Sequence, residues 1–198
     1  MRPLMIIGAG GHGKVVKDIA RACGYQQIGF LDDADLPGLA GKVCDYEDYI
    51  STSDFVIAIG NNAVRGRLFE ELDKKNAIIV SLVHPYAAVS DSAVIGKGTV
   101  VVAGAVINAD TVIGQGVILN TGSSVDHDCV VEDFCHVSVG AHVCGTVHIG
   151  KRTMVGAGAT IVNNLEVCED CMIGAGAVVV KNIEEQGTYI GVPARKMA

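Results

Sequence analysis

The sequence predicts a small α/β domain followed by an all-β parallel β-helix, and three observations support this fold class. An aliphatic residue recurs at every sixth position from Val89 to Val179 without interruption. The residues before this repeat alternate short apolar strands with helix-forming segments. A glycine-rich turn separates the first of these strands from the first helix. We therefore expect an α/β domain over residues 1–83 and a β-helix with a C-terminal tail over residues 84–198.

The N-terminal residues contain enough strands and helices for one half of a Rossmann-like domain. The expected strands cover residues 4–7, 27–31, 55–59 and 77–82, and the expected helices cover residues 14–23 and 64–75. A dinucleotide-binding domain needs two such halves, and about eighty residues cannot supply both. The length of this region therefore argues against NAD and favours a nucleotide diphosphate-sugar.

Three loops follow the expected strands of this domain. The run Gly8–Gly13 spells the G-x-G-x-x-G pattern after the first strand. Asp32 and Asp33 follow the second strand, and Gly60 and Asn61 follow the third. Because the carboxyl ends of parallel strands share one edge of a sheet, these loops should meet in one crevice, where glycine lets the backbone approach a phosphate. A glycine turn without a ligand is the alternative interpretation.

The period of six residues is typical of a prism in which three short strands form each coil. Residues three repeats apart then stack along the axis in inward-facing columns, and about five coils result. Glycines between the repeat positions supply the tight corners. The three columns are Ile95, Ile113, Val131, Ile149 and Val167; Val101, Leu119, Val137, Val155 and Ile173; and Ile107, Val125, Val143, Ile161 and Val179.

Composition and charge exclude several classes of function. The net charge is −7 and no cluster of Lys and Arg occurs, so a nucleic-acid partner is not expected. No apolar run reaches the ~18 residues of a membrane span, and the N-terminus lacks the apolar core of a signal peptide. We therefore expect a cytoplasmic protein with no membrane insertion. Its seven cysteines should be reduced, and the C-x-x-C spacing of Cys168 and Cys171 is weak support for metal or redox chemistry.

The flat outer faces of such a prism need a cover, and the simplest cover is another copy of the chain. Side-by-side prisms would also form grooves between subunits. The six-residue repeat and the closing segment Gly191–Arg195 resemble those of the hexapeptide-repeat acyltransferases. That resemblance implies a left-handed β-helix, a homotrimer and acyl-CoA sites between subunits.

With its three N-terminal loops, the whole chain resembles the sugar O-acyltransferase family, which is sialic acid O-acetyltransferase-like. This family includes the bacterial UDP-4-amino-sugar N-acetyltransferases of the bacillosamine pathway. The resemblance implies acetyl transfer from acetyl-CoA to the 4-amino group of a nucleotide-linked 4-amino-4,6-dideoxy sugar, in the first place a UDP sugar, for bacterial glycan or glycoprotein biosynthesis. The residues implied to contact the nucleotide sugar are Gly10, Gly11, His12, Asp32, Asp33, Gly60 and Asn61.

Acetyl transfer to an amine needs a group that accepts the proton, and histidine is the usual residue. His127 lies in the segment Asp126-His127-Asp128, near a corner of the prism that should face a groove between subunits. A neighbouring carboxylate raises the basicity of an imidazole and fixes its tautomer. Asp128 is our candidate for this role, because the family has an acidic residue after its histidine, and Asp126 is the competing partner. A solvated surface histidine is the alternative interpretation.

The resemblance also implies an acetyl-CoA site. In that site His136 should face outward and help to hold the co-substrate, while small residues let the pantetheine run close to the backbone. The residues assigned in this way are His136, Gly145, Ala157 and Ala175.

No metal is expected. His142 and His148 continue the six-residue spacing from His136, so the three rings should lie on different faces of the prism. Zinc chemistry between subunits, as in proteins that resemble γ-class carbonic anhydrases, is a minor alternative. Sugar O-acetylation of the sialic-acid type and a nucleotide-sugar-binding scaffold without catalysis also remain open.

Overall fold

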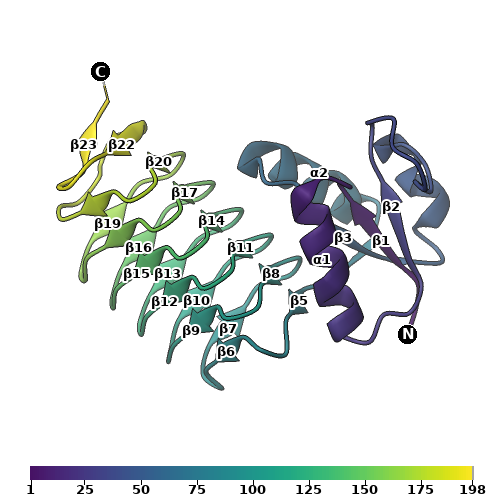
Figure 1. The fold of residues 1–198 in the computed structure, drawn as a ribbon, viewed down its shortest axis with the longest axis horizontal. Helices are drawn as coiled ribbons and strands as arrows, with labels where there is room; N and C mark the ends of the chain where they lie inside the picture. The colour runs from purple at the N-terminus through teal and green to yellow at the C-terminus, as the bar shows by residue number, and fades with distance from the viewer. Residues whose placement is uncertain (198) are drawn as a thin grey trace.

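The computed structural model describes residues 1–197, which form an N-terminal α/β region and a long stack of coils (Figure 1). The N-terminal strands form a parallel sheet in the order β2-β1-β3-β4. None of the helices in residues 1–197 is long and apolar enough to cross a membrane. The elements of this region are β1 (Leu4–Ile7), α1 (Gly11–Ala22), β2 (Ile28–Leu31), the 3₁₀ helix η1 (Val43–Tyr49), β3 (Asp54–Ile57), α2 (Asn62–Lys74) and β4 (Ile78–Ile79).

The two helices cover opposite sides of this sheet, because successive side chains of a strand point to opposite faces. Leu4 and Ile6 of β1 belong to a buried cluster with Val16 of α1. Ile7 belongs to a separate buried cluster with Leu68 of α2. The carboxyl ends of β1, β2 and β3 therefore form one exposed edge between the two helices, where the three predicted loops lie.

The stack of coils is a prism with one sheet on each of three sides. Face 1 holds β5 (Leu82–Val83), β8 (Val100–Val101), β11 (Ile118–Leu119), β14 (His136–Val137), β17 (Met154–Val155), β20 (Met172–Ile173) and β22 (Thr188–Ile190), followed by the antiparallel β23 (Arg195–Lys196). Face 2 holds β6 (Ala88–Val89), β9 (Val106–Ile107), β12 (Ser124–Val125), β15 (His142–Val143), β18 (Thr160–Ile161) and β21 (Val178–Val179). Face 3 holds β7 (Val94–Ile95), β10 (Val112–Ile113), β13 (Val130–Val131), β16 (His148–Ile149) and β19 (Glu166–Val167). We name each corner by the two faces that it joins.

The fold class expected from the sequence is confirmed. Strand pairing aligns Leu119 with Val101 and with Val137, as the column of face 1 requires, and all three are fully buried. Stacked β-branched and leucine side chains fill the interior of the prism. Parallel pairing extends from β5 to β22, beyond both ends of the periodic segment, so the prism has about six coils rather than about five.

Most N-terminal boundaries lie within two residues of expectation, and two differ more. α1 starts at Gly11 rather than at residue 14, because Gly10 is the N-cap and the following residues already form the first helical turn. The expected strand 77–82 is two strands: β4 pairs with β3, whereas β5 pairs with β8 of the prism. Both strands are short and apolar, so their boundary is not visible in the sequence. Since β5 already belongs to face 1, the division of the chain at residue 83 stays a prediction.

Each corner of the prism contains a residue with a left-handed backbone conformation. At the corner of faces 2 and 3, φ is 58° at Asp110, 56° at Asp128, 59° at Thr146 and 61° at Asn164. Asp and Asn tolerate this region better than most residues. Asp128 therefore suits the local backbone, and the same corner presents its side chain to solvent.

We expect Ile149→Ala to destabilise the prism by about 2–5 kcal/mol, because Ile149 is fully buried and its truncation leaves a cavity between coils. Val112→Ala is the matched control: the side chain points outward from the same face and is 43% exposed, so the loss should stay within about 0.5 kcal/mol. Urea unfolding followed by circular dichroism measures both variants. Equal losses would contradict the inward column.

Candidate active site

The glycine-rich segment after β1 forms the first turn of α1. Gly10 provides no side chain to hydrogen-bond the first N–H groups of the helix, and no acidic residue lies in this turn. The positive end of the helix dipole is therefore free to meet an anionic ligand, as in helices that bind phosphate.

The glycines at this edge form two groups. A Cβ at Gly8 or Gly13 would lie 2.7 Å or 2.1 Å, respectively, from a backbone oxygen. In contrast, no atom of the described residues lies within 4 Å of a Cβ at Gly10, Gly11 or Gly60. Gly8 and Gly13 thus allow the helix to pack closely on the sheet, whereas the other three border open space.

Asp32 and Asp33 brace the loop after β2. Asp32 accepts hydrogen bonds from the N–H groups of Ala9 at 2.6 Å and Ala34 at 2.8 Å, and the bond from Ala9 is the main cause that lowers the pKa of Asp32. Asp33 accepts a hydrogen bond from the N–H of Val43 at 3.0 Å. Both carboxylates therefore tie this loop to its surroundings, and Asp32 links it directly to the glycine turn.

Arg65 of α2 was not singled out by the sequence, and it connects the N-terminal region to the prism. Its side chain is 1% exposed, and Nη1 donates to Ile59 O at 2.9 Å. Nε donates to Gly116 O and Nη2 to Phe134 O, both at 2.6 Å, at the corner of faces 3 and 1. Burial lowers the pKa of Arg65 to about 10, so the guanidinium stays charged at neutral pH.

The sequence contains a signal that could have revealed Arg65, because this charged residue occupies a position in an otherwise apolar helix face. The spacing of Arg65, Leu68, Phe69 and Leu72 is that of one buried helix face, and all four side chains are buried. A charged residue within such a stripe indicates a buried polar contact. Asn61 also has a structural role: its side chain caps α2 by accepting a hydrogen bond from the N–H of Val64 at 3.0 Å.

His12 and His136 lie close to this guanidinium, at the junction between α1 and face 1. Burial, followed by the charge of Arg65, lowers the pKa of each histidine to about 4. The Asn120 side chain accepts a hydrogen bond from the N–H of Thr121, so its amide nitrogen donates to Nε2 of His136 at 3.1 Å. His136 points away from the prism interior, as expected, but the N-terminal region covers it and leaves it 8% exposed.

His127 and Asp128 form a hydrogen-bonded pair at the corner of faces 2 and 3. Asp128 Oδ2 lies 2.8 Å from His127 Nδ1, and both side chains are more than half exposed. Because a carboxylate only accepts, Nδ1 carries the hydrogen and Nε2 keeps a lone pair. The hydrogen bond to Asp128 is the main cause that raises the pKa of His127. This pair can act as a general base through Nε2.

Asp126 and Gly145 fix the place of this ring. Asp126 accepts hydrogen bonds from the N–H of His127 at 2.9 Å and from the side chain of Asn108 at 2.8 Å, so it holds the backbone, whereas Asp128 holds the ring. A Cβ at Gly145, one coil further on, would lie 2.6 Å from His127 Nε2. Glycine at this position therefore leaves the room that the imidazole occupies.

The predicted site residues fall into three groups within one chain. The N-terminal loop residues and His136 adjoin face 1, and His127, Asp128 and Gly145 lie at the corner of faces 2 and 3. Ala157 and Ala175 lie at the corner of faces 1 and 2, on successive coils joined by the hydrogen bond from Gly176 N to Ala157 O. Both alanines are exposed, so this corner offers a backbone ridge with small side chains.

The side chains of His142 and His148 lie on different faces of the prism and do not contact each other. His142 contacts Ser124 on face 2, and His148 contacts Glu132 at the edge of face 3. Within residues 1–197, no group of three or more His, Cys, Asp or Glu side chains is placed to hold a metal ion.

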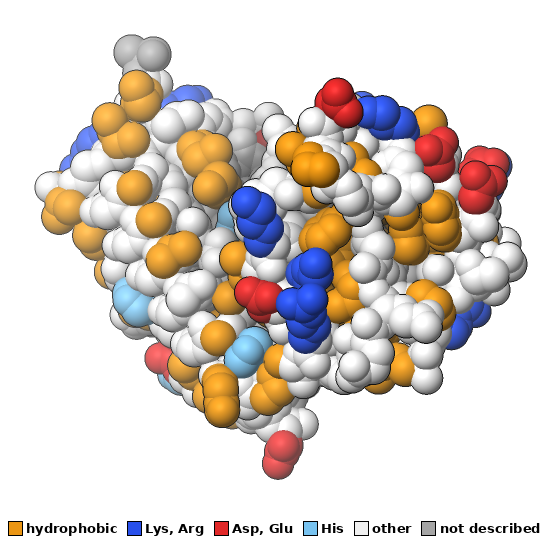
Figure 2. All heavy atoms as spheres, turned by 45° about the vertical axis from the view of Figure 1, so that its right-hand side comes forward, with side chains coloured by type: hydrophobic (Ala, Val, Ile, Leu, Met, Phe, Trp, Pro, Cys, Tyr) orange, Lys and Arg blue, Asp and Glu red, His pale blue; other side chains and the backbone are white. Residues whose placement is uncertain are grey.

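A cavity of about 520 Å³ opens beside the glycine turn. Its basic side chains come from one side of α1 and its apolar ones from β2 and the following loop. Figure 2 shows Lys and Arg side chains gathered near the middle of the side of the molecule that it views. The lining includes Lys14, Lys17, Arg21, Phe30, Leu36 and Leu39. Cations beside an apolar wall suit a ligand that carries both phosphate and an aromatic base.

Two family models match the chain. Residues 3–72 match the PglD N-terminal domain, and residues 146–181 match the bacterial transferase hexapeptide model of six repeats. The UDP-N-acetylbacillosamine N-acetyltransferase of Bacillus subtilis (strain 168) is 38% identical over 113 residues. That match spans 52% of this chain and 52% of the relative, so the chain aligns with about half of this curated protein.

Solved structures match over the whole chain. The acetyltransferase domain of PglB from Neisseria gonorrhoeae FA1090 is 40% identical, with a TM-score of 0.95 and 100% of each chain covered. The same domain has been solved with acetyl coenzyme A. PerB from Caulobacter crescentus, solved with CoA and GDP-perosamine, is 35% identical, with a TM-score of 0.93 and 99% of this chain and 97% of that chain covered.

We expect the low pKa values of His12 and His136 to make stability depend on pH. Between the ordinary value of 6.5 and about 4, the unfolded chain binds protons at these positions and the native chain does not. The free energy of unfolding should therefore fall as pH drops through this window, by up to about 1.4 kcal/mol per pH unit for each histidine.

His136→Gln removes one of these groups and should flatten the dependence, while the exposed His142→Gln serves as the control. Urea unfolding at a series of pH values measures the slopes. A slope unchanged by His136→Gln would contradict the assignment.

Proposed function

Because the chain belongs to the PglD-type family of hexapeptide-repeat acyltransferases, we propose that it moves the acetyl group of acetyl-CoA to the 4-amino group of a UDP-linked 4-amino-4,6-dideoxy sugar. The observation that carries the proposal is the His127–Asp128 pair, in which Nδ1 is bound to the carboxylate and Nε2, beside Gly145, keeps a free lone pair. The names of the Bacillus and Caulobacter relatives support a nucleotide-linked amino sugar as the acceptor.

The reaction needs one proton acceptor and one set of N–H donors. The neutral sugar amine attacks the thioester carbon, and His127 Nε2 accepts the amine proton as the C–N bond forms. Asp128 stabilises the resulting imidazolium through Nδ1. A backbone N–H near Gly145 stabilises the oxyanion, and the CoA thiolate that leaves takes the proton back from His127.

The nucleotide part of the substrate fits the N-terminal edge. The N–H groups at the start of α1 face the pyrophosphate, and Gly10, Gly11 and Gly60 leave space for its approach. Lys14 and Lys17 supply positive charge along the adjoining cavity, which compensates for the overall negative charge of the chain.

The complete site requires two copies of the chain. In one chain, His127 lies at the corner of faces 2 and 3, whereas Ala157 lies at the corner of faces 1 and 2. In a homotrimer, the first corner of one copy meets the second corner of the next, which brings His127 of one copy to the nucleotide sugar and acetyl-CoA held by its neighbour. We place this enzyme in the bacterial cytoplasm, in glycan or glycoprotein biosynthesis.

We expect His127→Ala to lower kcat by about 10²–10⁴ while leaving the KM for the nucleotide sugar nearly unchanged. The control is His142→Ala, an exposed histidine one coil away on face 2, which should keep wild-type turnover. Thiol release from acetyl-CoA, with mass spectrometry of the sugar product, measures both variants.

The assay should include UDP-, dTDP- and GDP-linked 4-amino sugars and a hydroxyl-only sugar. Near-wild-type turnover of a folded His127→Ala protein would overturn the role of His127. Acetylation of the hydroxyl-only sugar alone would replace the proposed reaction by O-acetylation.

We also expect two inactive variants to restore each other. His127→Ala removes the base, and Gly10→Glu places a negative charge where the phosphates should bind. If each site uses one half from each of two copies, mixed trimers should recover about a quarter of wild-type activity at equal mixing. Activity that stays at the level of the separate variants would show that each site lies within one copy.

A further inference from the structure

Cys168 and Cys171 form a close pair of thiols at the corner of faces 3 and 1. Their sulfur atoms are 3.4 Å apart, and both cysteines are unbonded. Cys168 is partly exposed, whereas Cys171 is 2% exposed. The acetyl-transfer reaction uses neither residue.

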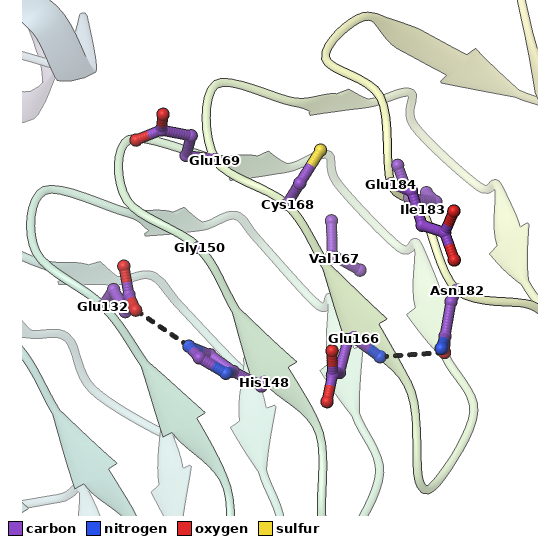
Figure 3. A pocket seen from close by; sticks show the side chains of 10 residues that line it. All are labelled: Glu132, His148, Gly150, Glu166, Val167, Cys168, Glu169, Asn182, Ile183 and Glu184. Carbon is purple, nitrogen blue, oxygen red and sulfur yellow. Dashed lines mark hydrogen bonds and ion pairs between the residues drawn. The ribbon is translucent and has the colours of Figure 1, made fainter.

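A cavity of about 320 Å³ opens at Cys168 (Figure 3). Cys168 lines the cavity, whereas Cys171 does not line it and is almost completely buried. Four carboxylates line the same space, and two of them have cationic or imidazole neighbours: Glu132 contacts His148 at 2.9 Å, and Glu169 contacts Arg152 at 3.1 Å. The other two are Glu166 and Glu184. This negative lining favours cationic reagents over anionic ones.

We propose that Cys168 and Cys171 are a redox site, which small cationic disulfides oxidise to an intrachain disulfide through this acidic cavity. In the first step, the Cys168 thiolate attacks one sulfur of the reagent and releases one thiolate. In the second step, Cys171 loses its proton and attacks Cys168 Sγ, which releases the second half of the reagent. The protein loses two electrons and two protons, and the reagent becomes two thiols.

The order of these steps follows from burial. Burial raises the pKa of the Cys171 thiol to about 12, so Cys171 is a poor first nucleophile. Once Cys168 carries the mixed disulfide, Cys171 lies next to the sulfur that it must attack. Closing the sulfurs to the ~2.05 Å of a disulfide requires a small shift of two side chains in one turn.

The test compares cystamine, which is cationic, with oxidised glutathione, which is anionic. It uses the full chain with Cys44→Ser, since Cys44 is an exposed thiol that would react independently. We expect cystamine to react at least about tenfold faster at low ionic strength, and the difference to shrink in high salt. Mass spectrometry of tryptic peptides without reduction should show the peptide with both cysteines lighter by two hydrogens.

Two further variants separate the steps. Cys171→Ser should keep a stable cysteamine adduct on Cys168, and Cys168→Ser should give no adduct at Cys171. A Glu166→Gln, Glu184→Gln double variant should reduce the preference for cystamine. A wild-type pair that keeps the adduct without closing, or a rate equal for both reagents, would overturn the proposal.

Discussion

The arrangement of this protein depends on one buried guanidinium. Within residues 1–197, Arg65 has no carboxylate partner among its hydrogen bonds, and its donors are satisfied by backbone carbonyls and by the side chain of Asn62. A buried charge is costly unless its hydrogen bonds are complete. A displacement of α2 that breaks these hydrogen bonds while the guanidinium stays buried is therefore strongly unfavourable. Arg65 therefore fixes the position of the N-terminal region along the prism axis and its orientation on face 1.

Burial separates the histidines into two chemical classes, and the charge of Arg65 adds to its effect on the buried ones. His12 and His136 are buried near Arg65 and stay neutral at physiological pH. His127 lies on the far side of the prism, exposed and paired with a carboxylate that raises its pKa. One residue type thus supplies neutral imidazoles at the proposed substrate edge and a basic imidazole at the proposed catalytic corner.

The sequence predicted what depends on local or periodic order. The six-residue repeat determines the prism, and the contact between His127 and Asp128 joins neighbours in the chain. Contacts between distant segments were beyond reach of the pattern: the burial of His136 results from docking of the N-terminal region. The boundary between β4 and β5 could not be predicted either. The two strands have similar composition and differ only in the sheet to which each one pairs.

Arg65 also constrains how the prism can change in length during evolution. It binds the carbonyl groups of Gly116 and Phe134, which stand at equivalent corners of successive coils, and the chain between them carries His127. A coil inserted there would move the two carbonyls apart by a further ~4.8 Å, beyond the span of one guanidinium. Coils gained or lost after β21 leave this spacing intact. Variation in the number of coils among descendants of this chain should therefore concentrate at the C-terminal end.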